Sequence, residues 1–402
     1  MPLRFTWPCL AAGVLLAGAV AAQPLPDLRP SLNEAVEQAW RLTAESRSAR
    51  LRAEEFDART RAAASFMAGA PSVGVAHRTD RPGTNAGLRE SEVELSVPLW
   101  RAGVRNATLA QVDADRAALG NDLLLAKAKV ASEVRDLAAQ VAVSRIERDI
   151  AVRRAEEARV LADDVGRRVR AGDSARVDLL QAEGTRHQAR AAAALAEAAL
   201  QRLLGQWTAL TGGTPVAALD ETPLPAQEPA AVAAARTHLR AAEAKLRLTE
   251  ADRSDPLEVG VGVTRERPSF GAGSETSMRI ALRVPLGSYG RNGPKLAAAR
   301  AELEAAQAQA DIALRTADAE RASAQGELEA ARVAETSAAA RAGSAAEVHR
   351  LLANAWRLGE TDLPTRLRAE AERFDAERAH ARAQIDTKRA ISRLNQANGI
   401  LP

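Results

Sequence analysis

The sequence predicts a mainly α-helical protein with a small β part. It is built from two copies of one repeat, in which a helix, a strand hairpin, a very long helix and a returning helix follow one another. Three observations lead to this class. Of the 402 residues, 46% are hydrophobic but only 3% are aromatic. Residues recur at one constant offset along the chain, and two runs of about 70 residues contain no proline beyond their first turn.

The composition excludes several classes of protein. Two or three ordinary compact domains would need bulky cores, which five Phe, five Trp and one Tyr cannot supply. The apolar residues are mostly Ala, Leu and Val among mixed charges, a composition typical of long, closely packed helices. The 55 basic and 52 acidic residues leave a net charge of +3, which is too even for a nucleic-acid partner.

The first 22 residues have the pattern of a secretory signal peptide. A positive start, Met1–Arg4, precedes an apolar stretch, and small residues allow cleavage near Ala22. The only cysteine, Cys9, lies inside this segment, with Pro8 before it and the apolar run after it. We therefore expect neither a disulfide nor lipidation. No later stretch reaches the roughly 18 to 20 apolar residues of a membrane-spanning helix, so any membrane contact must be made by strands.

The two halves of the chain repeat one another. The Val-Pro-Leu motif at 97–99 returns at 284–286, and the same offset relates several other residues. These pairs include Gly103 and Gly290, Gly172 and Gly359, Leu180 and Leu367, and Glu183 and Glu370. We predict a first repeat over 23–204, a Gly- and Pro-rich linker over 205–229 and a second repeat over 230–402.

Each repeat is expected to carry one strand hairpin after its first helix. The first helices are predicted over about 32–67 and 230–251, and the hairpins over about 72–98 and 257–285. Apolar side chains alternate there with polar residues or Gly, the pattern of strands with one apolar face. The predicted outward face comprises Val73, Val75, Val93, Leu95, Val97, Val259, Val261, Val263, Ile280, Leu282 and Val284.

A long helical run follows each hairpin, from Gly103 to Gly172 and from Gly290 to Gly359. At about 1.5 Å rise per residue, each run spans roughly 100 Å. The second run has a small or apolar residue at every seventh position, which favours coiled-coil packing through a narrow seam. This ladder comprises Leu296, Leu303, Ala310, Ala317, Ala324, Ala331, Ala338, Ala345 and Leu352. The glycines at 172 and 359 then mark the tips where the long helices turn back.

Four strands cannot close into a barrel by themselves. An open sheet edge in hydrocarbon leaves backbone groups unpaired, at a cost of several kcal/mol for each group. Strands that enter a membrane must then be shared between copies, and three copies would supply 12 strands, within the range of outer membrane barrels. Trp100 and Tyr289 follow the closing strands and are candidate membrane-interface anchors. The alternative is that they pack at the strand-to-helix joints.

Short motifs mark the joints and tips of this plan. They are Val97-Pro98-Leu99, Val284-Pro285-Leu286 with Arg291-Asn292-Gly293, Arg170-Ala171-Gly172-Asp173-Ser174 with Asp178-Leu179-Leu180-Gln181-Ala182, and Arg357-Leu358-Gly359-Glu360-Thr361-Asp362-Leu363. Their order, duplication and spacing resemble the TolC-type outer membrane factor (outer membrane efflux protein) family. Within it, the resemblance is greatest to the outer membrane components of heavy-metal efflux systems. It covers nearly the whole mature chain.

The resemblance implies a homotrimer. Each chain would form one third of an α-helical barrel in the periplasm and of a 12-stranded β-barrel in the lipid of the cell outer membrane. It also implies a periplasmic adaptor (membrane fusion protein) and an inner-membrane resistance-nodulation-division pump as partners. The chain would be a passive efflux duct for metal cations or small toxic compounds. Two alternatives stay open: a channel for type I protein secretion, and a periplasmic coiled-coil adaptor or scaffold without a pore.

The resemblance further implies that residues around the tip glycines dock the adaptor. They are Gly172, Ser174, Asp178, Leu179, Gly359, Thr361, Asp362 and Leu363. Ser174 and Thr361 are also predicted N-caps of the returning helices. Charges near the tips are candidates to hold a closed state through ion pairs, the alternative being a solvated surface. These candidate gate charges are Arg170, Arg176, Asp178, Arg357, Glu360, Arg366 and Arg368.

The sequence predicts no catalytic, cofactor or metal site, and hence no enzyme. The five histidines stand singly, without partners at metal-ligand spacing. The segment Gly271-Ala272-Gly273 lies in a predicted hairpin loop and does not open a helix, unlike a phosphate-binding loop. The many carboxylates are explained by pairing on helix surfaces.

Overall fold

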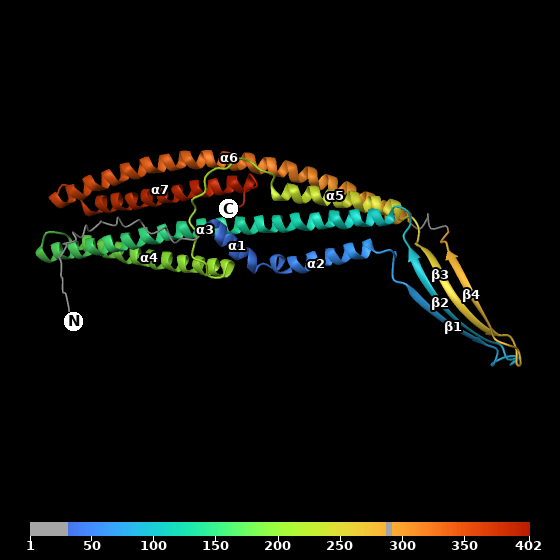
Figure 1. Ribbon diagram of the computed structural model, residues 1–402. Coiled ribbons are helices and arrows are strands. Elements are labelled where there is room, and N and C mark those ends of the chain that lie inside the picture. Colours follow the sequence, from blue (N-terminus) through green and yellow to red (C-terminus); the bar gives the residue numbers. More distant parts are fainter. Residues whose placement is uncertain (1–30, 287–291) are drawn as a thin grey trace, which may run out of the picture.

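The chain forms an elongated helical wall with a sheet projecting from one end (Figure 1). The computed structural model describes residues 31–286 and 292–402. Two helices set the length of the wall: α3 (Val104–Ala171) has 68 residues and α6 (Gly293–Leu358) has 66. Each therefore spans roughly 100 Å, as predicted, at about 1.5 Å per residue.

Among the described residues, five shorter helices complete the wall: α1 (Leu32–Leu42), α2 (Ala44–Ala64), α4 (Arg176–Thr211), α5 (Ala230–Ala251) and α7 (Leu363–Ala397). The helix α3 contacts α2 and α5 toward the sheet and α4 and α7 toward the other end, and α6 lies against α5 and α7 (Figure 1). The order across the wall is thus α2/α4, α3, α5/α7, α6. This order leaves α6 at one edge and α2 with α4 at the other.

The predicted first helix over 32–67 is wrong as a single element. It breaks at Thr43, whose hydroxyl donates to the carbonyl of Trp40 at 2.8 Å and accepts from the backbone N–H of Ser46 at 3.2 Å. One side chain therefore ends α1 and caps α2. The second segment ends at Ala64, three residues before the predicted boundary.

The predicted linker boundary at residue 205 is also wrong. Helix α4 continues to Thr211 because its last turns are packed: Trp207 is only 2% exposed, and its indole donates to the carbonyl of Thr214 at 2.6 Å. The helix ends at Gly212, which has φ 72°, a left-handed conformation that glycine adopts without steric cost. The connection to α5 therefore begins about seven residues later than the sequence predicts.

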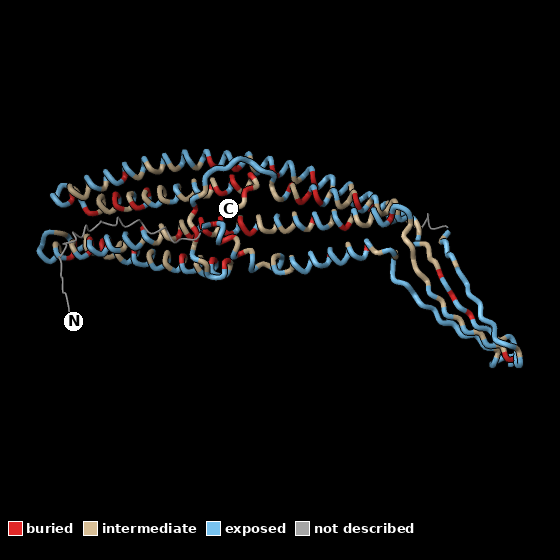
Figure 2. The backbone as a smooth tube through the Cα atoms, viewed as in Figure 1, coloured by how far each residue is buried: buried red, intermediate tan, exposed pale blue. Residues whose placement is uncertain are grey.

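The coiled-coil seam lies where the ladder predicts. Along α6, the ladder residues Ala310, Ala317, Ala324 and Ala345 are buried, and its other members are half-buried. Each hairpin packs along its length, α3 against α4 and α6 against α7. Figure 2 shows the buried positions as narrow stripes along the inner helix faces, gathered most densely near the middle of the wall. The protein is held together by seams rather than by one thick core.

The strands pair into a single antiparallel sheet of order β1-β2-β3-β4, with β1 (Ser72–Thr79), β2 (Arg89–Leu99), β3 (Leu257–Arg267) and β4 (Glu275–Arg283). Strands β2 and β3, one from each repeat, pair along their length from Arg89 opposite Arg267 to Leu99 opposite Leu257. The two repeats are thus joined in the sheet, and β1 and β4 are its free edges.

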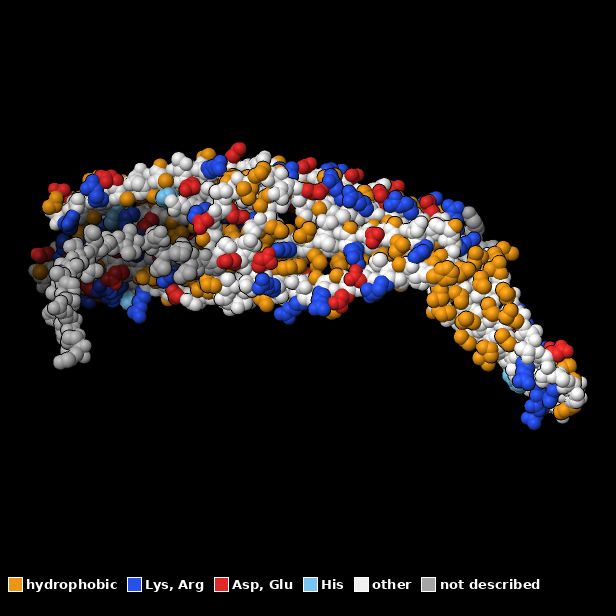
Figure 3. All heavy atoms as spheres, viewed as in Figure 1, with side chains coloured by type: hydrophobic (Ala, Val, Ile, Leu, Met, Phe, Trp, Pro, Cys, Tyr) orange, Lys and Arg blue, Asp and Glu red, His pale blue; other side chains and the backbone are white. Residues whose placement is uncertain are grey.

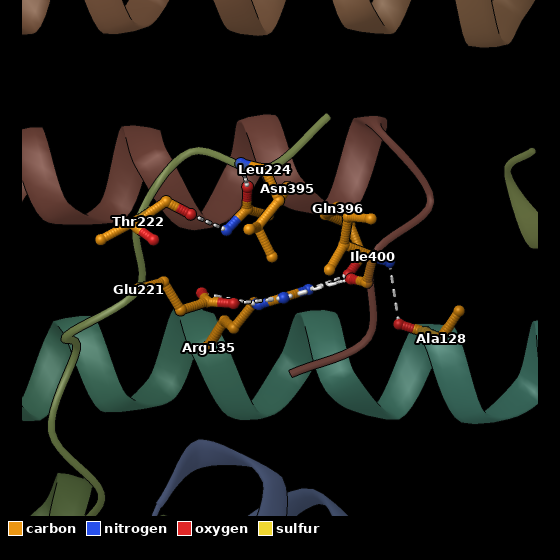
Figure 4. A network of polar contacts seen from close by, with 8 residues as sticks. All are labelled: Ala128, Arg135, Glu221, Thr222, Leu224, Asn395, Gln396 and Ile400. Atoms are coloured by element: carbon orange, nitrogen blue, oxygen red, sulfur yellow. Dashed lines mark hydrogen bonds and ion pairs between the residues drawn. The ribbon is translucent and has the colours of Figure 1, made fainter. Parts of the chain in front are cut away.

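A buried polar cluster in the middle of the wall fastens the linker to both repeats (Figure 4). Arg135 of α3 is 4% exposed and pairs with Glu221 of the linker at 2.5 Å. Its guanidinium also donates to the carbonyl of Ile400 at 3.2 Å. Asn395 of α7 accepts from the N–H of Leu224 at 3.0 Å and donates to the carbonyl of Thr222 at 2.9 Å. These bonds satisfy the buried charge and fix the linker against α3 and α7.

Candidate functional site

The sheet presents a wide apolar face to the outside of the chain. Val75, Val93, Val263 and Met278 form one cross-strand row through their register, and each is between 48% and 77% exposed. The rest of the predicted outward set is exposed too, except Val97 and Val259, which are half-buried. Figure 3 shows this face as a continuous hydrophobic surface over the strands. An exposed apolar patch of this extent marks a surface that is covered in use.

The opposite face of the sheet is polar, as the alternation predicts, but the ion pairs on it were not predicted. Its ion pairs join Arg78 to Glu90, Arg279 to Glu92 and Arg283 to Glu258 at 3.8, 3.1 and 2.7 Å. A Cβ at Gly260 would lie 2.6 Å from the Oε1 atom of Glu94, so a larger residue there would displace that carboxylate from its present position. The alternation of glutamates along β2 could have indicated that this face is charged, because side chains two apart on a strand project together.

The two tips of the helical hairpins have the same geometry. Gly172 and Gly359 have φ 88° and 81°, and the residue after each glycine donates its N–H to a carbonyl five residues back, Asp173 to Arg168 and Glu360 to Ala355, both at 2.8 Å. This is the hydrogen-bond pattern of a glycine that ends a helix in the left-handed conformation. Each glycine therefore reverses the chain, as the sequence predicts.

The predicted N-caps at the tips are wrong. Helix α4 has Ala175 as its N-cap, without a side-chain bond, and α7 has Asp362, whose carboxylate accepts from the N–H of Thr365 at 2.9 Å. Hydrogen bonding from the side chain of Thr365, together with this backbone N–H, lowers the pKa of Asp362. Ser174 and Thr361 each lie one residue too early because both turns are one residue longer than the prediction assumed.

An aromatic cluster joins the two hairpins just behind their tips. Trp356 of α6 is 9% exposed and packs with Leu161 and Val165 of α3 and with Leu363 of α7. The guanidinium carbons of Arg168 and Arg366 lie 4.0 and 4.1 Å from ring centroids of its indole, within reach for cation–π attraction. Arg168 belongs to the first repeat and Arg366 to the second, so the indole of Trp356 contacts one guanidinium group from each hairpin.

Beside this cluster lies a cleft of about 520 Å³ that contains a buried carboxyl group. Glu370 of α7 is 5% exposed, and its carboxylate has no hydrogen-bond or ion-pair partner among the residues that the structure describes. Burial, reinforced by repulsion from Glu157, raises its pKa. Burial also lowers the pKa of His349 and of Arg366. The cleft thus disfavours charge on each of these groups.

The candidate gate charges are dispersed rather than joined in one network. Arg366 alone enters the Trp356 cluster. Arg357 contacts Asn354 one turn away, and Arg368 donates to Pro364 and Thr365 on its own helix. Arg170, Arg176, Asp178 and Glu360 form no ion pair with any described residue. Of the predicted docking residues, Leu363 is buried within the tip cluster and Leu179 packs against that cluster, so both contribute to the packing inside the tip.

Ion pairs link the hairpins behind the tip. They join α3 to α7 between Glu157 and Arg373 at 2.5 Å, between Arg153 and Glu377 at 2.5 Å, and between Asp136 and Arg389 at 2.6 Å. Most of these side chains are partly exposed, so each pair contributes roughly 1 kcal/mol or less. The sequence does not indicate these pairs, because their partners lie far apart in the chain.

Of the two predicted interface anchors, Trp100 can be placed. It is half-buried, and its indole donates to the carbonyl of Ser65 at 2.9 Å, which ties the end of β2 to the end of α2. Tyr289 lies outside the described residues, as does the predicted signal segment. Within the described chain no helix is long and apolar enough to cross a membrane, and no cluster of three or more His, Cys, Asp or Glu residues could hold a metal.

Comparison with known proteins identifies the fold. No protein-family model matches the chain, and no curated protein matches its sequence. Several solved structures match over nearly its full length. The outer membrane protein VceC from Vibrio cholerae is 18% identical, with 92% of this chain and 96% of that one covered and a TM-score of 0.73. The Campylobacter jejuni CmeC outer membrane channel is 14% identical, with 92% and 85% covered and a TM-score of 0.75. CusC is 16% identical, with 93% of each chain covered and a TM-score of 0.76. The chain has the fold of TolC-like outer membrane channels, as its sequence motifs indicate.

Proposed function

We propose that this protein is the outer membrane channel of a tripartite efflux system, a passive duct without a catalytic step. The observation that carries the proposal is an exposed apolar sheet face with two free edges, fixed to the end of a helical wall roughly 100 Å long. A globular binding protein has no use for such a face, whereas a protein that enters a membrane through strands requires one. The likeness to outer membrane channels supports the same reading.

The free edges indicate how the pore forms. Strands β1 and β4 lie at opposite edges of the sheet, so β4 of one copy can pair with β1 of the next. Three copies would close a 12-stranded barrel. The apolar face would then meet lipid, and the face that carries Glu92 and Arg279 would line a water-filled lumen. Closure also removes the unpaired backbone groups that lipid does not tolerate.

The helical wall carries apolar residues at both of its outer edges. On α6, Ile312 and Val333 are 46% and 68% exposed, and on α4 Val177 and Leu195 are 56% and 72% exposed. In a ring of three copies, the α6 edge of one wall meets the α2/α4 edge of the next and covers these side chains. The result is an α-helical barrel that continues the strand barrel into the periplasm.

At the far end of this barrel, the tips around Gly172 and Gly359 are the proposed docking points for a periplasmic adaptor. Ser174, Asp178, Thr361 and Asp362 are available there for contact. An inner-membrane pump of the resistance-nodulation-division class would supply the energy and deliver metal cations or small toxic compounds. The duct itself needs neither a cofactor nor a resident metal.

Cross-linking of the sheet edges tests the proposal. Ala76 of β1 and Ala281 of β4 project from the polar face of the sheet, at its two edges. The Ala76→Cys/Ala281→Cys variant, treated in membranes with a bismaleimide, should give covalent trimers. Each single variant is the matched control and should stay uncross-linked, because a ring of copies places β1 against β4 and never against another β1. Monomers alone from the double variant, or dimers from either single variant, would refute the ring.

A further inference from the structure

The apolar face of the sheet ends in a basic border at the hairpin loops. Arg265 follows Val263 by two residues on β3 and therefore projects from the same face. Arg89 on β2 pairs across the strands with Arg267, one step further out. Arg81 lies in the adjoining β1–β2 loop. Figure 3 shows basic side chains gathered at this end of the sheet, beyond the hydrophobic surface.

Arg267 donates to the carbonyl of Gly87 at 3.4 Å, but the other arginines of this border differ from the remaining arginines of the sheet in their lack of ion-pair partners. The arginines at 78, 279 and 283 point to the polar face and pair with glutamates. By contrast, Arg81, Arg89 and Arg265 are exposed, and none forms an ion pair with any described residue. Arg89 and Arg267 are also directly opposite one another, and like charges so placed are destabilising. The positive charge of the border is therefore left for a partner outside the chain.

The depth of the border indicates what that partner is. Along β2, the stretch from Leu99 to Arg89 rises about 26 Å if each residue contributes about 3.4 Å and the strands tilt by about 40°. The lipid-facing band of an outer membrane barrel is about 25 Å tall. When the apolar rows fill that band, Arg89 and Arg265 lie at the level of the headgroups on the side away from the helical wall.

We propose that Arg89 and Arg265, assisted by Arg81, bind the phosphate groups of lipids in the outer leaflet. Arg265 and Arg89 are diagonal neighbours on adjacent strands, a spacing of about 7 to 8 Å that long side chains can bridge. Two guanidinium groups can therefore reach a single phosphate, to which each donates a fork of N–H bonds. This inference rests on the proposed function, because it requires that the sheet enters a membrane.

The test uses the full chain purified in a neutral detergent. Phosphorylated lipid A and the same lipid after removal of its phosphates are titrated in turn, and binding is followed by native mass spectrometry. The Arg89→Gln/Arg265→Gln variant should bind the phosphorylated lipid about 25-fold more weakly, on the basis of about fivefold for each arginine near an anionic surface. The control variant, Arg279→Gln/Arg283→Gln, loses the same charge from the polar face and should bind as the unaltered protein does.

The outcomes separate this inference from the proposed function. Insertion of the unaltered protein into phosphatidylcholine vesicles is measured first, and failure to insert would refute the channel itself. If the protein inserts but binds both lipids equally, or if the Arg89/Arg265 variant binds the phosphorylated lipid unchanged, the phosphate site is refuted alone. Inorganic phosphate is added as a competitor. Displacement of the lipid by free phosphate at equal concentration would replace the lipid site with a site for the free ion.

Discussion

Replacement of Trp356 by Ala should loosen the contact between the two hairpins at the tip. Truncation of a buried Trp costs about 3 to 5 kcal/mol, and this residue is 9% exposed. Part of that cost falls within the α6–α7 hairpin. The part that joins the hairpins includes the contact with Arg168, at 4.0 Å, for which cation–π attraction contributes about 0.5 to 2 kcal/mol. If the variant loses about 1.4 kcal/mol of the interaction free energy between the two hairpins, the ratio of open to closed tips changes about tenfold.

Single-channel recording in planar bilayers measures this change. If the unaltered protein is closed most of the time, the Trp356→Ala variant should spend about ten times longer in conducting states. Trp356→Phe keeps an aromatic ring between the arginines and should show a smaller change. Arg357→Gln, which removes an exposed charge beside the cluster, is the control for a purely electrostatic effect. An open probability of Trp356→Ala equal to that of the unaltered protein would show that the cluster does not hold the tip closed.

Three other predictions concern stability and the tip turn. Arg135→Ala should lower the free energy of unfolding by about 3 to 5 kcal/mol, because it removes a buried guanidinium and leaves Glu221, only 13% exposed, unpaired. Arg389→Ala, at a partly exposed pair, should lower it by roughly 1 kcal/mol or less. Urea midpoints compare the two variants, and equal losses would contradict the burial argument. Because the pKa of Glu370 is raised, its contribution to stability is present below the ordinary carboxyl pKa and is lost as pH rises through the raised pKa. Glu370→Gln should therefore gain melting temperature relative to the unaltered protein as the pH increases, and a constant difference at all pH values would refute this. Gly359→Val places a β-branched residue at φ 81° and should impair efflux while trimers persist; normal efflux would argue against adaptor docking at this tip.

Features with a local cause were predicted well from the sequence. The seam of α6 follows from a seven-residue spacing, and the turns at Gly172 and Gly359 follow from the conformational freedom of glycine after a long helix. The alternation in the hairpins identified which side chains are exposed. These patterns depend on neighbours within one element, so they can be predicted from the sequence without knowledge of the fold.

Features that depend on contacts between elements were not predicted. Trp356 corresponds to Val169 in the first repeat. The residue types at these two positions do not indicate that the indole contacts Arg168 of the other hairpin. Glu370 corresponds to Glu183, yet only Glu370 is buried, because α3 covers that part of α7. The N-caps were misplaced by one residue because the length of a turn is set by packing of the helices that it joins.

The contacts between the first and second hairpins also indicate where the wall can bend. In the middle, Arg135 is buried in a cluster that joins α3, α7 and the linker, and its disruption would leave charged groups unpaired in the interior. Between the middle and the tip, the hairpins are joined by partly exposed ion pairs such as Arg153 with Glu377, which water can replace at little cost. At the tip, the packing of Trp356 is strong but confined to one point. A helix pair held firmly at its centre and weakly beyond it moves most at its free end. Release of the Trp356 cluster would therefore let the tip move relative to the Arg135 cluster, while the sheet and the part of the wall between the sheet and Arg135 stay in place.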